Sequence, residues 1–335
     1  MRALWRWPVI CAMVGNMPSN DAQPTLIIGH DGSPGATHAL VVGLALADRL
    51  GASVEIVRAF AIADSPASVA DLLGYPGAAD ELSTAVRDQL ISDTRDFVTA
   101  HPGLTAQYLV RAGRPADVLC ALTSADRMLV VGSRGRGGFT GLLLGSVSNE
   151  CLHRADGAVL VVPEVGRRHI STPAARAGDP VDLAPIVTEQ TIVVGHDGSA
   201  QSDHALTRAL ELALRLDAPV VVIRSWTIDT APKGSVWDQG YVSSFREISA
   251  TVTRELERDI RPLLDEYPTV SVTGHGVFGG AEEVLLRSSS DARMLVLGNR
   301  GRGGFEGLLL GSVSTKCADR ANCPVLVVPS RGGSD

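Results

Sequence analysis

The sequence contains one glycine-rich stretch twice, and each copy has the same surroundings. The first copy runs from Gly132 to Ser148 and the second from Gly298 to Ser314, and most of their residues are identical. Asp31 lies before the first copy at the offset at which Asp197 lies before the second. A repeat of this length predicts two copies of one domain, folded in tandem.

The constant offset between the copies sets the expected domain boundaries. We predict domains at 25–163 and 191–329, joined by a linker at 164–190, with tails at 1–24 and 330–335. The linker region carries three prolines and no apolar period, which is typical of a connecting segment.

The amino-acid composition indicates aliphatic cores and argues against nucleic-acid binding. Hydrophobic residues make up 45% of the 335 residues but aromatic residues only 4%, so the cores must be aliphatic, which suits buried parallel strands. The formal net charge of −7 argues against a nucleic-acid partner, because binding one needs a basic surface.

Short apolar runs alternate with segments of helical spacing. In the first copy we expect strands at 25–28, 53–60, 104–110, 128–131 and 158–162, and helices at 36–50, 81–100, 114–125 and 146–154. In the second copy we expect strands at 191–194, 220–226, 270–274, 294–297 and 324–328, and helices at 205–216, 244–266 and 281–290. This alternation predicts an α/β, Rossmann-like fold in which each copy forms an open parallel sheet with helices on both faces.

Each glycine-rich stretch follows an expected strand and precedes an expected helix. Glycines let the backbone approach a ligand closely, and a helix N-terminus offers unpaired N–H groups to an anion. The stretch is therefore a candidate phosphate cradle. The alternative is a long surface turn in which Ser146 and Ser312 are ordinary N-caps.

Asp31 and Asp197 follow the first strand of each copy. In an open parallel sheet, ligands bind beyond the carboxyl ends of the strands, so each Asp and its glycine stretch can reach one crevice. An ionised carboxylate accepts hydrogen bonds from ribose hydroxyls, although an Asp in Asp-Gly-Ser is also a common turn former. Together the two features favour a nucleotide, and neither a Walker A loop nor a dinucleotide fingerprint fits the spacing.

The spacing Gly132-x2-Gly135-x9-Gly145-Ser146, with Asp31 after the first strand, resembles the ATP-binding signature of the universal stress protein family. The second copy repeats it with Gly298, Gly301, Gly311, Ser312 and Asp197. The resemblance covers nearly the whole chain. It implies two five-stranded parallel sheets of order 3-2-1-4-5, the fold of the adenine nucleotide alpha hydrolases, each binding ATP, with Mg²⁺ as a candidate companion ion.

The resemblance also implies which residues contact ATP. In the first domain these are Gly29, Asp31, Ala59, Gly132, Ser133, Arg134, Gly135, Arg136, Gly137, Gly138, Gly145, Ser146, Val147 and Ser148. In the second domain they are Gly195, Asp197, Ser225, Gly298, Asn299, Arg300, Gly301, Arg302, Gly303, Gly304, Gly311, Ser312, Val313 and Ser314. The Asp lies near the sugar, Ala59 and Ser225 face adenine, and the rest hold the sugar and phosphates. The four loop arginines either approach phosphate or stay solvated.

Catalytic and metal-binding residues are not indicated by the sequence. No loop lysine or water-positioning base suits phosphoryl transfer, so we expect at most a weak ATPase. His30 and His196 recur beside the Asp residues but have no His or Cys at ligand spacing, which is typical of structural histidines. No C-x-x-C pair occurs among the five cysteines, which indicates a reducing compartment.

The N-terminal run from Trp7 to Gly15 faintly resembles a signal peptide but is short and contains Pro8. A tail, or a true start at Met13 or Met17, is the preferred interpretation, and we expect a cytoplasmic protein with no membrane span.

The last strand of each copy ends its sheet and would expose an apolar edge, which aggregates unless it is paired. We therefore expect the two domains to pair edge to edge as a pseudo-dimer, and two chains to form a homodimer. The predicted function is a nucleotide-dependent regulator of the stress response, acting on an unidentified regulatory partner. The alternatives are a slow ATPase or adenylating enzyme, and an interaction module that binds no nucleotide.

Overall fold

The computed structural model describes residues 24–60, 78–136, 144–164, 186–232, 244–302 and 310–330. The expected site residues Gly137, Gly138, Gly303 and Gly304 lie outside these ranges, as do most of the predicted linker and nearly all of both tails.

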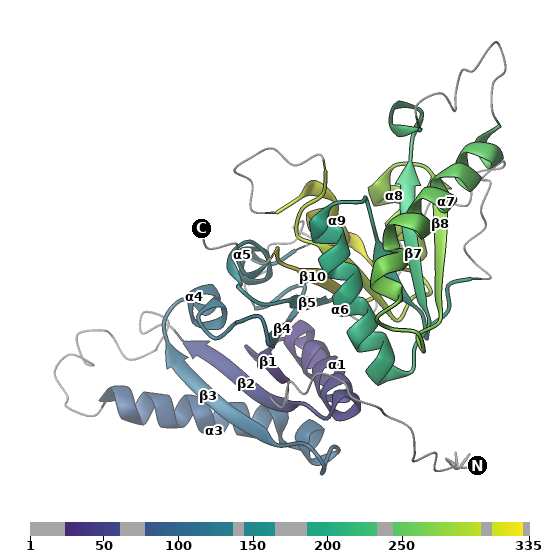
Figure 1. Ribbon diagram of the computed structural model, residues 1–335. Coiled ribbons are helices and arrows are strands. Elements are labelled where there is room, and N and C mark those ends of the chain that lie inside the picture. Colours follow the sequence, from purple (N-terminus) through teal and green to yellow (C-terminus); the bar gives the residue numbers. More distant parts are fainter. Residues whose placement is uncertain are drawn as a thin grey trace, which may run out of the picture.

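The two halves of the chain form matching sheets, as the repeat predicts (Figure 1). The strands of the first half are β1 (Thr25–Gly29), β2 (Ser53–Phe60), β3 (Ala106–Ala112), β4 (Arg127–Gly132) and β5 (Val159–Val162). Those of the second half are β6 (Ile192–Gly195), β7 (Val220–Trp226), β8 (Val272–Phe278), β9 (Met294–Gly298) and β10 (Val325–Val328). The orders β3-β2-β1-β4-β5 and β8-β7-β6-β9-β10 confirm the predicted α/β fold with strand order 3-2-1-4-5.

The two five-stranded sheets join into one sheet of ten strands. Strand β5 pairs with β10 in the antiparallel direction, with Leu160 opposite Leu326, whereas the other pairs among the described strands are parallel. This confirms the expected pairing of the two apolar edges. Because the joining pair is antiparallel, the carboxyl ends of the strands in the two halves point to opposite edges of the sheet.

Helices cover both faces of this sheet. The first half contributes α1 (Pro34–Leu50), α3 (Ala78–Thr99), α4 (Pro115–Cys120) and α5 (Ser146–Arg154). The second half contributes α6 (Ala200–Leu216), η2 (Ile228–Thr230), α7 (Phe245–Leu264), α8 (Ala281–Ser288) and α9 (Ser312–Arg320).

Each face of the sheet has a core that runs through both halves. Helices α1, α3, α6 and α7 pack on one face, where Leu160 is fully buried, and α4, α5, α8 and α9 pack on the other, with Val159 and Val161. Successive residues of β5 thus enter opposite cores. This is why the strands read as continuous apolar runs, without polar alternation.

Several element boundaries differ from those expected. Helix α4 ends at Cys120 instead of 125, because Thr123 Oγ1 donates to the Cys120 carbonyl at 2.7 Å and the chain turns there. Strand β8 starts and ends later than expected, since its pairing with β7 as far as Phe278 outweighs the low strand propensity of Gly274 and Gly276.

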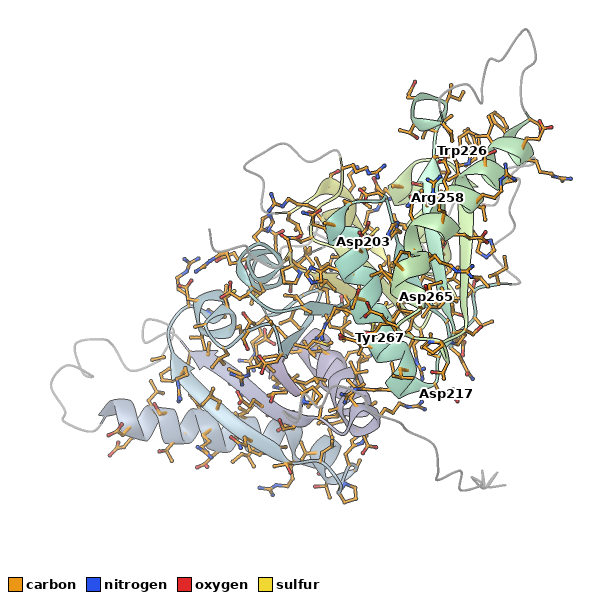
Figure 2. All side chains as sticks on the ribbon, in the orientation of Figure 1. Asp203, Asp217, Trp226, Arg258, Asp265 and Tyr267 are labelled. Atoms are coloured by element: carbon orange, nitrogen blue, oxygen red, sulfur yellow. The ribbon has the colours of Figure 1, made fainter. Side chains whose placement is uncertain are left out.

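Helix α6 starts earlier than expected and has defined ends. Ser199 Oγ accepts from Ser202 N at 3.2 Å and begins the helix, while Asp217, with a φ of 48°, ends it in the left-handed region. Figure 2 shows Asp203 and Asp217 at opposite ends of this helix. Across the part of the chain described here, no helix combines the length and apolarity needed to cross a membrane.

Candidate functional site

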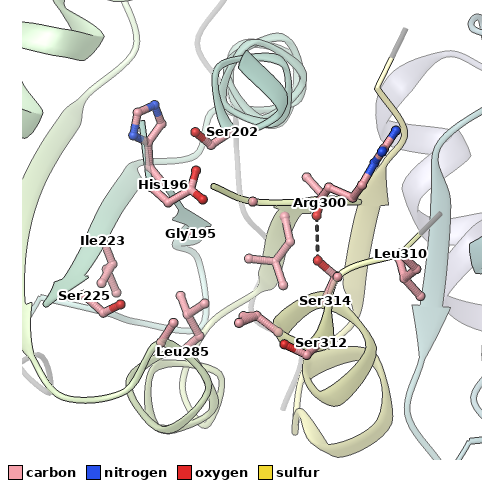
Figure 3. A pocket seen from close by; sticks show the side chains of 17 residues that line it. Gly195, His196, Ser202, Ile223, Ser225, Leu285, Arg300, Leu310, Ser312 and Ser314 are labelled. Carbon is pink, nitrogen blue, oxygen red and sulfur yellow. Dashed lines mark hydrogen bonds between the residues drawn. The ribbon is translucent and has the colours of Figure 1, made fainter. Parts of the chain in front are cut away.

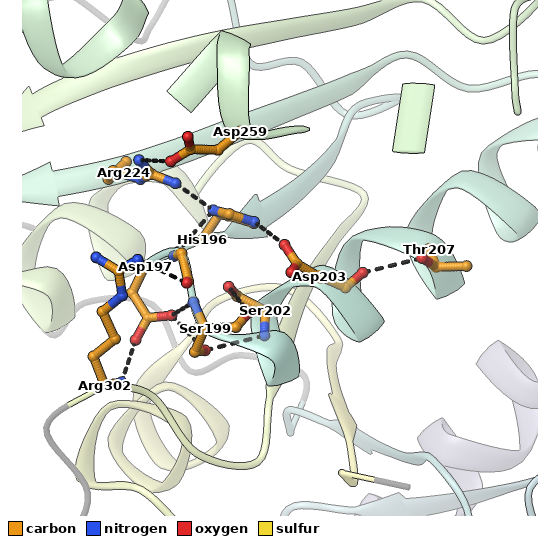
Figure 4. A network of polar contacts seen from close by, with 10 residues as sticks. His196, Asp197, Ser199, Ser202, Asp203, Thr207, Arg224, Asp259 and Arg302 are labelled. Carbon is orange, nitrogen blue, oxygen red and sulfur yellow. Dashed lines mark hydrogen bonds and ion pairs between the residues drawn. The ribbon is translucent and has the colours of Figure 1, made fainter. Parts of the chain in front are cut away.

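The Asp residue and the glycine-rich loop of each half meet at the carboxyl ends of neighbouring strands. Strand β1 pairs directly with β4, and Asp31 Oδ2 accepts from Arg136 N in the loop at 2.8 Å. In the second half, Asp197 Oδ2 accepts from Arg302 N at 2.6 Å (Figure 4). The structure thus brings together the two features that the sequence places in one crevice.

The Asp31 carboxylate is ionised in this position. Burial opposes its ionisation, but hydrogen bonds from Ser33 and from Arg136 N outweigh burial and hold the pKa of Asp31 below its usual value. The pKa of Asp197 is lowered in the same way, against burial, by Ser199 and Arg302 N. Each carboxylate therefore ties the glycine loop to the strand end and keeps lone pairs for a further donor.

Two glycines of the loop are needed for these close approaches. A Cβ on Gly132 would lie 2.6 Å from the carbonyl oxygen of Gly35 at the start of α1. A Cβ on Gly135 would lie 2.5 Å from Asp31 Oδ2. The loop backbone thus passes within contact distance of both α1 and the carboxylate, which a side chain would prevent.

The helix that follows each loop starts without a side-chain cap. Gly145 is the N-cap residue of α5 and Gly311 that of α9, and no side chain in the described parts of the chain caps either helix. The alternative in which Ser146 and Ser312 are N-caps is therefore wrong, because each is the first helical residue. The N–H groups of the first turn have no intrahelical acceptor and remain available to an anion.

The second serine of each turn has a structural contact. Ser148 Oγ donates to the Gly132 carbonyl at 2.6 Å, and Ser314 Oγ donates to the Gly298 carbonyl at 2.6 Å. These hydroxyls fix the strand end against the helix. At these positions it is the backbone N–H groups that remain for a ligand.

A cavity of about 430 Å³ opens at this edge of the second half (Figure 3). Apolar side chains of Ile223, Leu285 and Leu297 line it together with the polar residues Asp197 and Ser312. The volume and this mixed lining are typical of a small-molecule site. Other expected site residues that line it are Gly195, Ser225, Gly298, Arg300, Gly301, Gly311, Val313 and Ser314.

The remaining expected residues lie around the same strand ends. Gly29 ends β1, and Ala59 lies near the end of β2, in the position that Ser225 has in β7. Ser133 and Asn299 follow β4 and β9, and their N–H groups donate to the last residues of β5 and β10. Val147 packs partly against the core.

The loop arginines differ between the halves. Arg134 Nη1 lies 3.8 Å from Glu164 Oε2. In contrast, Arg300 Nε is buried and has no hydrogen-bond partner within the described residues. The Arg302 guanidinium donates to the Gly198 carbonyl at 2.8 Å and so closes the loop over the Asp-Gly-Ser turn.

A network of polar side chains that the sequence motifs do not predict supports each Asp-bearing turn. Arg58 donates to His30 Nδ1 at 2.9 Å and to the His30 carbonyl at 3.0 Å, and it pairs with Asp93 of α3 at 2.7 Å. The second half repeats the contacts to the histidine ring and to the carboxylate, with Arg224, His196 and Asp259 (Figure 4). The sequence does contain a signal for this network, because the second strand of each half carries an arginine at the same position.

This network keeps His30 neutral. Burial, and next the charge of Arg58, lower the pKa of His30 to about 4. Because Arg58 can only donate, Nδ1 accepts, and the proton is on Nε2, 3.4 Å from Thr37 Oγ1.

We expect the free energy of unfolding to fall by about 3 kcal/mol between pH 7 and pH 4 on account of His30 alone. The unfolded histidine binds a proton near its usual pKa of 6.5, whereas the folded one does not until about pH 4. Urea unfolding across this range measures the effect. His30→Asn, which cannot titrate, should remove that part of the fall, and an unchanged slope in this variant would contradict the assignment.

The sequence and the fold of this chain both resemble those of universal stress proteins. The profile of the Universal stress protein family matches residues 24–163 and 189–329. A universal stress protein of Mycolicibacterium smegmatis is 33% identical over 231 residues, which are 68% of this chain and 70% of that protein. One of Mycobacterium tuberculosis is 26% identical over 315 residues, 93% of this chain and 98% of that protein. A solved universal stress protein from Archaeoglobus fulgidus has the same fold, with a TM-score of 0.62 at 19% identity over 93% of this chain and 98% of that one. With two matches that together span most of its length, the chain belongs to the universal stress protein family.

Proposed function

We propose that each half of this universal stress protein binds one ATP and that occupancy of the two sites regulates a partner in the stress response. The ligand would lie across the ends of β1 and β4 in the first half and of β6 and β9 in the second. The observation that carries the proposal is the second-half cavity, which meets the glycine loop, the Asp197 carboxylate and the uncapped start of α9.

The chemistry of the cavity suits the parts of ATP. Its apolar lining, with Ile223, Leu285 and Leu297, gives an adenine ring a surface to pack on. Asp197 is ionised and accepts hydrogen bonds, as a ribose hydroxyl requires. The first-turn N–H groups of α9 and the helix dipole favour the negative phosphates, so no lysine is required.

The expected affinity follows from a small number of hydrogen bonds. Hydrogen bonds to charged groups contribute about 1.5–3 kcal/mol each, so four or five of them offset association costs and leave the roughly 8 kcal/mol of a micromolar complex. Some loop amides are already used by the protein, since Gly145 N and Gly311 N donate to the loop carbonyls of Ser133 and Asn299. Donors that remain among the described residues include the first-turn amides of α5 and α9.

Regulation by binding is favoured over rapid catalysis. The carboxylates of Asp31 and Asp197 already accept from the loop, and Lys316 of α9 is paired with Glu282. Both alternatives, a slow ATPase or adenylating enzyme and a module without nucleotide, are outcomes of the experiment below. A Mg²⁺ ion beside the phosphates, a homodimer, a cytoplasmic location, the domain boundaries and the regulatory partner stay predictions.

Denaturing the purified protein and separating the released small molecules by ion-exchange chromatography tests this proposal. We expect adenine nucleotide, up to two per chain, and only slow release of phosphate when fresh ATP is added to the native protein. Turnover of many ATP molecules per minute would favour the enzyme. A protein that releases no nucleotide and takes up no added ATP would favour the interaction module.

A further inference from the structure

We propose that Arg58 and Arg224 are positioning residues, which hold the Asp-bearing turn of each site in the geometry that binds nucleotide. This inference rests on the proposed function and adds residues that lie outside the family signature described above. It makes affinity at each site depend on a chain of contacts that leads away to helix α3 or α7.

The chain in the first half starts on the outer helix and ends at the loop. Asp93 of α3 pairs with Arg58, and Arg58 donates both to the ring and to the carbonyl oxygen of His30. The next residue, Asp31, accepts from Arg136 N of the glycine loop. Arg58 thus fixes the backbone of the residue that directly precedes the predicted ribose-binding carboxylate.

The second half has a similar chain, which has one added link but lacks the contact to the histidine carbonyl, since Arg224 Nε has no hydrogen-bond partner among the described residues. Arg224 pairs with Asp259 of α7 at 2.8 Å and donates to His196 Nδ1 at 3.0 Å. Gly198 N also donates to His196 Nδ1, at 3.2 Å, so the ring itself holds the Asp-Gly-Ser turn. Figure 4 shows this chain running from Asp259 toward Asp197.

Stability alone does not account for these two ion pairs. The Arg58 residue is 8% exposed and lies above the core residues Val54 and Ile56, on the same face of β2. Replacing a buried ion pair by apolar side chains of similar volume is often neutral or stabilising. The two pairs, whose arginine side chains are largely buried and whose carboxylates are 25% and 32% exposed, each lead to the backbone next to a site Asp, which points instead to a role in shaping the site.

The experiment measures the first site alone, in a Gly301→Val background that blocks the second. Titration calorimetry measures the ATP affinity of the Gly301→Val parent and of the same protein with Arg58→Met added. The added substitution removes all three contacts of Arg58. We expect the Arg58→Met variant to bind ATP about tenfold more weakly per folded molecule. This loss corresponds to roughly one well-placed hydrogen bond. Arg127→Met is the matched control, because Arg127 pairs with Glu55 at the amino ends of the strands and should leave affinity unchanged.

A second pair of variants, at His30, tests the positioning role even if Arg58→Met fails to fold. His30→Asn keeps an oxygen near the position of Nδ1 and can accept from Arg58, whereas His30→Leu cannot. We expect Asn to bind ATP within about threefold of the parent and Leu to bind about tenfold more weakly. A purely structural histidine would change the unfolding free energy in both variants without separating their affinities.

The outcomes distinguish this inference from the proposed function. If the parent binds no ATP, the proposed function fails and this inference fails with it. If the parent binds ATP and the folded Arg58→Met or His30→Leu variant binds it equally well, the positioning role is wrong while the proposed function stands.

Discussion

Replacing Gly135 and Gly301 together by valine is expected to weaken ATP binding at both sites by at least about 100-fold. A Cβ on Gly135 would lie 2.5 Å from Asp31 Oδ2, and one on Gly301 would collide with the Asp197 carboxylate. The loop must then move away from the Asp, and the ligand loses two or more charge-assisted hydrogen bonds of about 1.5–3 kcal/mol each. Titration calorimetry with ATP measures the loss.

Gly103→Val is the matched control for this experiment. A Cβ on Gly103 meets nothing closer than Asp48 Oδ1 at 4.0 Å, and the residue is remote from both loops. It should therefore bind ATP like the unchanged protein. If the folded double variant also binds ATP normally, the glycine loops do not form the site.

Leu326→Asp is expected to lower the free energy of unfolding by more than about 4 kcal/mol. Leu326 is fully buried and faces Leu160 across the only antiparallel pair of the described sheet. A carboxylate at this position would lie in the core that both halves share, without a partner. Urea unfolding gives the loss of stability, and sedimentation velocity shows whether the chain opens.

Leu214→Asp is the control, because Leu214 of α6 is already 36% exposed and its replacement should cost much less. A Leu326→Asp chain with unchanged stability and an unchanged sedimentation coefficient would mean that the β5–β10 pair does not hold the halves together.

Most of the fold could be predicted from the sequence because its signals are local. The apolar runs of β4 and β9, the prolines that open α1 and α4, and the repeat itself define the elements and their alternation. The β5–β10 pairing followed from strand order, since two apolar edges remained. The boundaries of β8 were wrong because cross-strand pairing, a tertiary effect, decides where a glycine-containing strand ends.

The site was only partly predictable. Glycines and Asp31 form a pattern along the chain, whereas Arg58 is a single charged residue in an otherwise apolar strand, and its partners His30 and Asp93 come from other elements. Only a comparison of the two halves, which places Arg224 in the same position of β7, would have revealed it. Likewise, no sequence pattern shows that Gly145, and not Ser146, caps α5, because that depends on the backbone angles.

Equilibrium dialysis with radiolabelled ATP, up to millimolar concentration, tests most directly whether backbone amides at the two strand-end loops hold a nucleotide. We expect saturation at two ATP per chain with micromolar dissociation constants, one micromolar site per chain in either single glycine variant, and only sites weakened by at least about 100-fold in the double variant. An absence of saturable binding by the unchanged protein across this range would contradict the account.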